Sequence, residues 1–266
     1  MNFNYNYNFV ESINNNLGGG QNPATKGLIV QLNYDNYTEG SLIWDDLSGF
    51  NNDARVIGDL QSTTLGWRFT SGSQLLLSAS LNGISSNPIV NAYDYTMQAY
   101  ITVDSGSGDQ MLFNKVGNTS PAQGFFTSFL DSGSYPGIGN GFAYYGRYFG
   151  DTIAENLTDR TIVTNPNTDP FVLHTLTTAN AFSGSTSSNI KTFSDYFKLY
   201  DSAPPLAPYA PPFNSLSNTS DLSFGRAVNE QYGYNGFRGT LKYLYIYNRP
   251  LTGNEIFNNY LYFSTH

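Results

Sequence analysis

The C-terminal stretch from Tyr234 to Phe263, YNGFRGTLKYLYIYNRPLTGNEIFNNYLYF, joins an aromatic strand pattern to a helix-start signal. Residues 240–247 are dense in Tyr, Leu and Ile, which is typical of a β-strand. Pro250 ends this strand, because proline cannot donate to a hydrogen-bond ladder. Strict alternation predicts two faces, one with Leu241, Tyr243, Tyr245 and Tyr247 and the other with Lys242, Leu244 and Ile246.

A short helix is predicted directly after this strand. Thr252 is a good N-cap residue and Glu255 follows three positions later, which is the spacing of a capping box. The pattern places Ile256, Phe257 and Tyr260 on the packed side of the helix. We expect the helix to close the end of the sheet.

Upstream of this stretch, short strand-like runs are separated by Gly, Asn, Asp and Ser about every ten residues. We expect strands at Gly27–Leu32, Leu75–Ser78, Tyr95–Val103, Gln110–Lys115, Gly124–Leu130, Phe142–Tyr148, Phe171–Thr177, Ile190–Leu199, Leu222–Gly225 and Gly239–Tyr247. The proline-rich run from Ala203 to Phe213 should be a stiff surface loop. The fold class predicted is all-β, a two-sheet antiparallel jelly-roll sandwich with a short C-terminal helix, forming one domain over residues 27–266.

Residues 1–26 are expected to be an N-terminal arm and linker outside that domain. Phe3, Tyr5, Tyr7 and Phe9 alternate with asparagines, and Asn-rich and Gly-rich runs follow. The alternation indicates a strand that docks on a partner. Two alternatives remain open: the arm is the first strand of the domain itself, or it is a disordered segment.

The composition excludes several classes of function. Charged residues make up 12% of the chain and the net charge is −8, which disfavours nucleic acid and anionic membranes as partners. The absence of cysteine excludes disulfides and thiolate metal sites. No stretch is apolar enough to span a membrane. Aromatic residues, at 16%, can supply a large core without many aliphatic ones.

Three stretches, GLIVQLNYDN, SLIWDDLSGFNNDARVIG and YNGFRGTLKYLYIYNRPLTGNEIFNNY, together resemble a known family. The chain is similar to the laminin-G-like branch of the concanavalin A-like lectin/glucanase superfamily, of the kind found in phage and viral structural proteins. The residues that match its first motif are Trp44, Asp46, Leu47, Ser48, Gly49 and Asn52. Those that match its last are Phe237, Gly239, Leu241, Ile246, Tyr247, Asn248, Arg249, Leu251, Thr252, Glu255 and Ile256.

The resemblance implies two packed antiparallel sheets, and in this branch a rim loop sometimes holds calcium. Beside the resemblance, the residues from Asp46 to Asp53 suit a structural corner. Their carboxylate and hydroxyl groups can accept from local backbone N–H groups, with Trp44 packed beneath.

Because the superfamily includes glucanases, an enzyme of this kind would carry a recognisable catalytic motif, above all paired carboxylates. Retaining glycosidases need two carboxylates about 5 Å apart, and no predicted strand carries two acids in phase. The glucanase phrase E-x-D-x-x-E is absent, as are H-E-x-x-H and G-x-S-x-G. His174, alone in an apolar strand, is interpreted as a core residue. From these observations we expect that the chain is not an enzyme.

Two kinds of ligand site remain as predictions. Asp104 and Asp109 flank a turn and could supply oxygens to calcium, the one cofactor considered, although the EF-hand spacing is missing. For carbohydrate, aromatic residues with amide or charged neighbours are the expected devices. The candidates are Tyr145, Arg147 and Phe149, then Tyr232, Tyr234 and Asn235; the alternative interpretation is core aromatics and a hairpin.

These observations favour a structural protein on the exterior of a virus or phage particle, as a capsid decoration, fibre or tail-associated protein. Other virion proteins would bind its arm, the chain would form homo-oligomers, and host glycans are candidate ligands. The alternative is a carbohydrate-binding or adhesion module of a bacterial surface protein, located at the cell surface.

Overall fold

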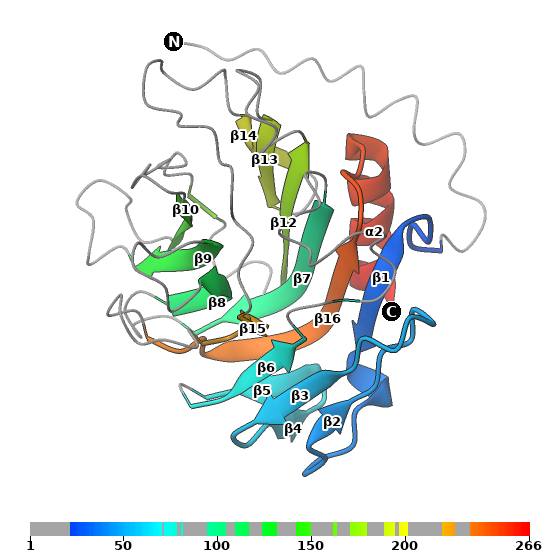
Figure 1. The fold of residues 1–266 in the computed structure, drawn as a ribbon, viewed down its shortest axis with the longest axis vertical. Helices are drawn as coiled ribbons and strands as arrows, with labels where there is room; N and C mark the ends of the chain where they lie inside the picture. The colour runs from blue at the N-terminus through cyan, green and yellow to red at the C-terminus, as the bar shows by residue number, and fades with distance from the viewer. Residues whose placement is uncertain are drawn as a thin grey trace.

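The computed structural model describes residues 22–70, 72–78, 81, 95–104, 110–116, 124–131, 142–149, 162–163, 171–179, 189–194, 197–201, 220–226 and 235–266. These residues form two antiparallel β-sheets and one C-terminal α-helix (Figure 1). The all-β sandwich predicted from the sequence is confirmed. The arm residues Phe3, Tyr5, Tyr7 and Phe9 and the proline-rich run 203–213 lie outside the described residues.

Sheet 1 is built around the C-terminal strand. Its order is β14 (Phe197–Asp201), β13 (Asn189–Ser194), β12 (Val172–Ala179), β7 (Tyr95–Val103), β16 (Gly239–Tyr247), β5 (Gly66–Phe69) and β4 (Gln61–Thr63), with β1 (Leu28–Asn33) also paired to β16.

Sheet 2 packs against it. Its order is β11 (Ile162–Val163), β10 (Phe142–Phe149), β9 (Gly124–Asp131), β8 (Gln110–Val116), β15 (Leu222–Phe224), β6 (Gln74–Leu77), β3 (Ala54–Ile57) and β2 (Ile43–Trp44). A 3-10 turn, η2 (Tyr34–Asn36), follows β1, and the helix α2 (Gly253–Thr265) ends the chain.

Strand β16 runs through the middle of sheet 1 beside β7 (Figure 1). On its other side lie β5 and β1, end to end: Leu241 pairs with Trp67, and Tyr243 with Asn33. The first and last predicted strands are therefore neighbours.

A bulge at Lys242 changes which residues of β16 face the sandwich interior. Leu241 is opposite Ile101 of β7, and Tyr243 is opposite the next residue, Tyr100, so Lys242 is extra. In a bulge two residues oppose one, and the side-chain alternation shifts. Leu241 consequently joins Leu244 in the core between the sheets, while Tyr243 faces α2. The predicted faces were wrong at this point, since alternation was continued through the bulge.

The core between the sheets is dominated by apolar side chains from both. Sheet 1 supplies Met97, Ala99 and Ile101, and sheet 2 supplies Leu75, Leu77 and Phe224. Phe224 meets Phe69 and Phe237 at ring-centroid distances of 5.4 Å each. Edge-on aromatic packing of this kind adds to the stabilisation from buried area.

Helix α2 covers the outer face of sheet 1 rather than closing its end. Its buried residues are Ile256, Asn259 and Phe263, while Phe257 and Tyr260 are half-buried, which corrects the predicted helix face. The capping box is confirmed: the Thr252 hydroxyl accepts from the Glu255 N–H, and the Glu255 carboxylate accepts from the Thr252 N–H.

The ten predicted strands are all present, and Ile190–Leu199 divides into β13 and β14. The strands β2, β3, β4, β5 and β11, each of two to four residues, were not predicted.

Candidate ligand-binding site

The corner from Asp46 to Asp53 is built as a structural element. The Asp46 carboxylate accepts from the backbone N–H groups of Gln31, Ser48 and Asn52 at 2.8, 2.9 and 3.0 Å. It also accepts from the Ser48 hydroxyl at 2.6 Å. A carboxylate that accepts three hydrogen bonds from its own loop and one from β1 stabilises the chain crossing.

Trp44 is fully buried beside this corner, as predicted. Its indole N–H donates to the Asn33 carbonyl and the Asn36 side chain, and its ring stacks on Tyr37 at 4.9 Å.

The predicted calcium residues are only partly described. The Asp104 carboxylate pairs with the Arg68 guanidinium at 2.5 Å, and Asp109 lies outside the described residues. Within the part of the chain that the structure describes, no group of three or more His, Asp or Glu side chains is placed to hold a metal ion. Calcium binding stays a prediction.

The predicted carbohydrate residues are described unevenly by the structure. Tyr145, Arg147 and Phe149 occupy alternate positions on β10, so they share a face of that strand. Their side chains, and all of Tyr232 and Tyr234, lie outside what the structure describes. Asn235 is exposed and bridges Gln110 at the start of β8, two strands from β10 in the sheet order.

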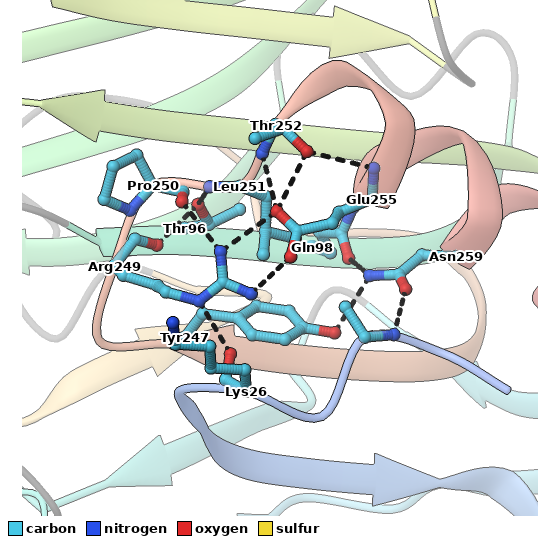
Figure 2. Close-up of polar contacts among 11 residues, drawn as sticks. Lys26, Thr96, Gln98, Tyr247, Arg249, Pro250, Leu251, Thr252, Glu255 and Asn259 are labelled. Atoms are coloured by element: carbon cyan, nitrogen blue, oxygen red, sulfur yellow. Dashed lines mark hydrogen bonds and ion pairs between the residues drawn. The ribbon is translucent and has the colours of Figure 1, made fainter.

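The turn after β16 is held by a bidentate ion pair (Figure 2). The Arg249 guanidinium donates to both carboxylate oxygens of Glu255, at 2.6 and 3.0 Å, and through Nε to the Lys26 carbonyl at 2.8 Å. The hydroxyl of Thr96 donates to the Arg249 carbonyl and accepts from the Leu251 N–H, each at 2.9 Å. Arg249 and the Thr252 groups hold the pKa of Glu255 down, to about 2, against the opposing effect of burial.

Beneath α2, Asn259 connects four elements through buried hydrogen bonds (Figure 2). Its amide donates to Gln98 of β7 at 2.6 Å and to the Tyr247 hydroxyl of β16 at 2.9 Å. Its oxygen accepts from the Ala24 N–H at 2.7 Å. The chain is thus fixed to the sandwich from Ala24 onward, slightly before the predicted boundary at residue 26.

At the other end of α2, a partly exposed group of side chains lies on the outer face of sheet 1. We call it the aromatic shelf, and it consists of Tyr34, Phe171, Lys242, Tyr243 and Tyr262. Tyr34, Lys242 and Tyr262 are half-buried, whereas Phe171 and Tyr243 are buried beneath them.

Aromatic packing holds the shelf rigid from below. Tyr243 stacks on Phe263 at 4.8 Å, and Tyr34 packs edge-on against Tyr243 at 6.1 Å. Tyr262 meets Tyr243 at 6.2 Å, and Phe171 stacks on Tyr100 at 5.0 Å. Rings fixed in this way lose little conformational entropy when a ligand covers them.

The Lys242 ammonium lies over the shelf. Its Nζ is 5.4 Å from the Tyr34 ring centroid, 5.9 Å from that of Phe171 and 5.7 Å from that of Tyr243, which is cation–π range. Burial lowers the pKa of Lys242.

The shelf phenols also influence one another. The pKa of Tyr243 is raised first by burial and then by Tyr262, Tyr34 and Asp35. All of these oxygens therefore lie within electrostatic range of Tyr243. The shelf offers aromatic faces, phenol hydroxyls and one ammonium at a single surface.

Sequence reasoning missed the shelf. Its residues come from η2, from the residue before β12, from β16 and from α2. They are far apart in the sequence, so no sequence motif contains them. The one local signal was Lys242 within a tyrosine-rich strand. Because the bulge is not visible in the sequence, simple alternation assigned Lys242 to the opposite face of the strand.

No helix in the described residues is long and apolar enough to cross a membrane. No protein-family model matches the chain, and no curated protein matches it. Several solved structures are similar to the chain. The chain is similar to a Trypanosoma rangeli sialidase in complex with sialic acid, at 16% identity and a TM-score of 0.59, over 95% of this chain and 37% of the sialidase.

The chain is also similar to the binding domain of botulinum neurotoxin DC in two complexes. One, with rat synaptotagmin II, has 14% identity and a TM-score of 0.59 over 90% of this chain and 52% of that one. The other, with SialylT, has 12% identity and a TM-score of 0.57 over 91% and 52%.

These similarities show the fold alone, a lectin-like β-sandwich, and the chain spans about a third to a half of the matched proteins. They are compatible with the concanavalin A-like resemblance at that level.

The expectation that the chain is not an enzyme is corrected by these comparisons. Sialidases are enzymes, and this chain shares their sandwich over 88% to 96% of its length. A pair of carboxylates is the catalytic arrangement of most glycosidases, but not of all. Sialidases with a tyrosine nucleophile depart from that arrangement, so its absence cannot exclude an enzyme.

Proposed function

We propose that this chain is a carbohydrate-binding β-sandwich domain and that the aromatic shelf is its glycan site. The observation that carries the proposal is the pair of half-buried tyrosines, Tyr34 and Tyr262, fixed against the buried Tyr243 beside a lysine ammonium. Sugar rings have apolar C–H faces, which pack on flat aromatic side chains. Their hydroxyl groups bind phenols and charged groups at the edges of such faces.

The shelf shares two features with small-molecule sites, a preformed base and a small number of polar groups. Its base is preformed, since Phe263 and Tyr100 hold the buried rings in place. Polar groups are few: the three phenol hydroxyls, Lys242 and the exposed Asp35. Such a site favours one ligand orientation.

The similar structures support carbohydrate as the ligand class. The Trypanosoma rangeli sialidase was determined with sialic acid and the botulinum neurotoxin DC binding domain with SialylT. The groups around Tyr145 and Tyr232 remain a second proposed glycan surface.

A glycan array tests the proposal. The wild type should bind one or a few related glycans, and Tyr262→Ala should lose at least tenfold in affinity. Tyr260→Ala is the matched control, because Tyr260 is a half-buried tyrosine on the same helix outside the shelf. Tyr145→Ala examines the second surface. Loss of binding with Tyr145→Ala and none with Tyr262→Ala would move the site to sheet 2, and no binding at all would refute the function.

A second proposal is that the domain is a structural protein of a virus or phage particle, attached through its N-terminal arm. The supporting observation is the fixed root of the arm: the Ala24 N–H is bound by Asn259 and the Lys26 carbonyl by Arg249. An arm that leaves from a rigid point can present a strand to a neighbouring subunit.

Removing residues 1–21 tests that second proposal without touching Ala24. Light scattering should show loss of the homo-oligomer, and the shortened chain should fail to incorporate into the particle. Unchanged incorporation would contradict it and leave the bacterial surface module as the alternative.

A further inference from the structure

We infer that the ligand of the aromatic shelf is an acidic sugar, whose carboxylate or sulfate group binds the Lys242 ammonium. This inference rests on the proposed function, because it names the class of glycan that the shelf selects. It follows from the surroundings of Lys242 and from the position of Asp35.

Lys242 is a half-buried cation in contact with aromatic rings. Among the residues that the structure describes, the three ring contacts above are its interactions and no carboxylate is paired with it, and burial lowers its pKa. Two other half-buried cations form ion pairs with carboxylates: Arg68 pairs with Asp104, and Arg249 with Glu255. In a chain with 20 acidic and 12 basic residues, carboxylates were available to pair with Lys242 as well.

Aromatic faces leave the hydrogen-bonding capacity of the ammonium unused. A lysine ammonium has three N–H donors, and a ring face attracts the charge without accepting through a lone pair. A carboxylate or sulfate oxygen arriving at Nζ would form a charge-assisted hydrogen bond in a partly desolvated place. The stem of Lys242 needs no rearrangement, because the bulge already places it on the shelf side of β16.

Asp35 supplies a carboxylate near the same surface. It is exposed, follows Tyr34 in the chain and raises the pKa of Tyr243, so it lies within electrostatic range of that phenol. An acidic sugar could therefore place its anionic group at Lys242 while its hydroxyl groups donate to Asp35.

The experiment uses neutral and acidic sugars in matched pairs: lactose with 3′-sialyllactose and with 3′-sulfolactose, galactose with galacturonate, and glucose with glucuronate. Dissociation constants for the full chain are measured by NMR titration. We expect the acidic member of the best pair to bind roughly 5- to 10-fold more tightly, as a single partly exposed ion pair would allow. The sialyl and sulfo arms separate a carboxylate from a sulfate as the anionic group.

Three variants make the result specific. Lys242→Met keeps the aliphatic stem and should abolish the acid preference, so that the acidic and neutral members of each pair bind equally. Lys242→Arg keeps the charge and should retain the preference. Lys26→Met removes an exposed lysine that is not part of the shelf, and it should behave as the wild type.

The outcomes distinguish the inference from the function it rests on. Equal binding of both members of every pair, with binding lost in Tyr262→Ala, would overturn the acidic-sugar inference and leave the glycan site standing. An acid preference that survives Lys242→Met would also overturn it. Absence of binding across all pairs, or binding indifferent to Tyr262→Ala, would overturn both.

Discussion

Gly239, the first residue of β16, pairs with Val103 of β7 and leaves no room for a side chain. A Cβ atom there would lie 1.9 Å from the Thr102 carbonyl oxygen and 2.8 Å from the Phe237 ring. Because the first obstacle is backbone, it cannot move aside as a side chain could. We predict that Gly239→Ala lowers the free energy of unfolding by about 3 kcal/mol, as measured by chemical denaturation.

Gly253 offers the control for this substitution. An added Cβ at Gly253 meets nothing within 4 Å, at the first turn of α2. Gly253→Ala should therefore be neutral or slightly stabilising. Equal stability of the Gly239→Ala variant and the wild type would show that the strands can separate at this point.

His174 predicts a pH dependence of stability. Burial lowers its pKa from 6.5 to about 3, so the folded protein keeps the imidazole neutral where the unfolded chain binds a proton. Stability is therefore lost as the pH falls below 6.5. Between pH 7 and 5 the loss through His174 should be about 2 kcal/mol.

Denaturation of His174→Gln at the two pH values measures this contribution. The variant should lose about 2 kcal/mol less than the wild type over this interval, whatever its stability at pH 7. His266→Gln, at an exposed histidine, is the matched substitution for comparison. Identical slopes for His174→Gln and the wild type would exclude His174 as the source.

At the scale of elements, the position of α2 depends on its capping residue and ion pair. Arg249 lowers the pKa of Glu255 from 4.5 to about 2, so the stability from this pair is present above pH 4.5 and is lost as the pH falls toward 2. The Glu255 side chain is 29% exposed, and solvent screening reduces the effect. We predict that Glu255→Gln costs about 1–2 kcal/mol at pH 7.

Chemical denaturation at pH 7 and pH 3 checks the sign. The difference between Glu255→Gln and the wild type should shrink at pH 3, where the wild-type carboxylate begins to lose its advantage. A difference that is independent of pH would mean that geometry, rather than charge, accounts for the loss.

Asn259 fixes both α2 and the N-terminal root. Asn259→Ala leaves the Gln98 side chain and the Ala24 N–H without this partner, so we predict a loss of about 2–4 kcal/mol. The amide of Ala24 should then exchange with deuterium much faster, measured by mass spectrometry under native conditions. Protection of Ala24 that matches the wild type would contradict this account of the root.

The elements also show where sequence reasoning succeeds and where it stops. The strand β16 and the capping box of α2 follow from local patterns, and both are present as predicted. Lys242 breaks the alternation through a bulge, which arises from pairing with β7 and leaves no mark in the strand itself. Asn259 is polar and yet fully buried, because its partners come from β7, β16 and the N-terminal root.

At the scale of the whole molecule, the sandwich could be predicted and the candidate site could not. Fold class follows from strand spacing and aromatic content, which are properties of the sequence as a whole. The aromatic shelf includes residues as far apart in sequence as Tyr34 and Tyr262. Both contact Tyr243 only once β16 lies between β1 and β7 and α2 packs on that face of the sheet. Composition could suggest glycan binding but could not select these tyrosines.

The most direct test of the proposed glycan site is an NMR titration of protein with ring-labelled tyrosine, using the tightest-binding glycan. The rings of Tyr34, Tyr243 and Tyr262 should shift together and saturate at one dissociation constant. Tyr37 and Tyr95, buried elsewhere in the core, should stay unchanged. Saturable shifts confined to other tyrosines, with the shelf rings unmoved, would contradict the account.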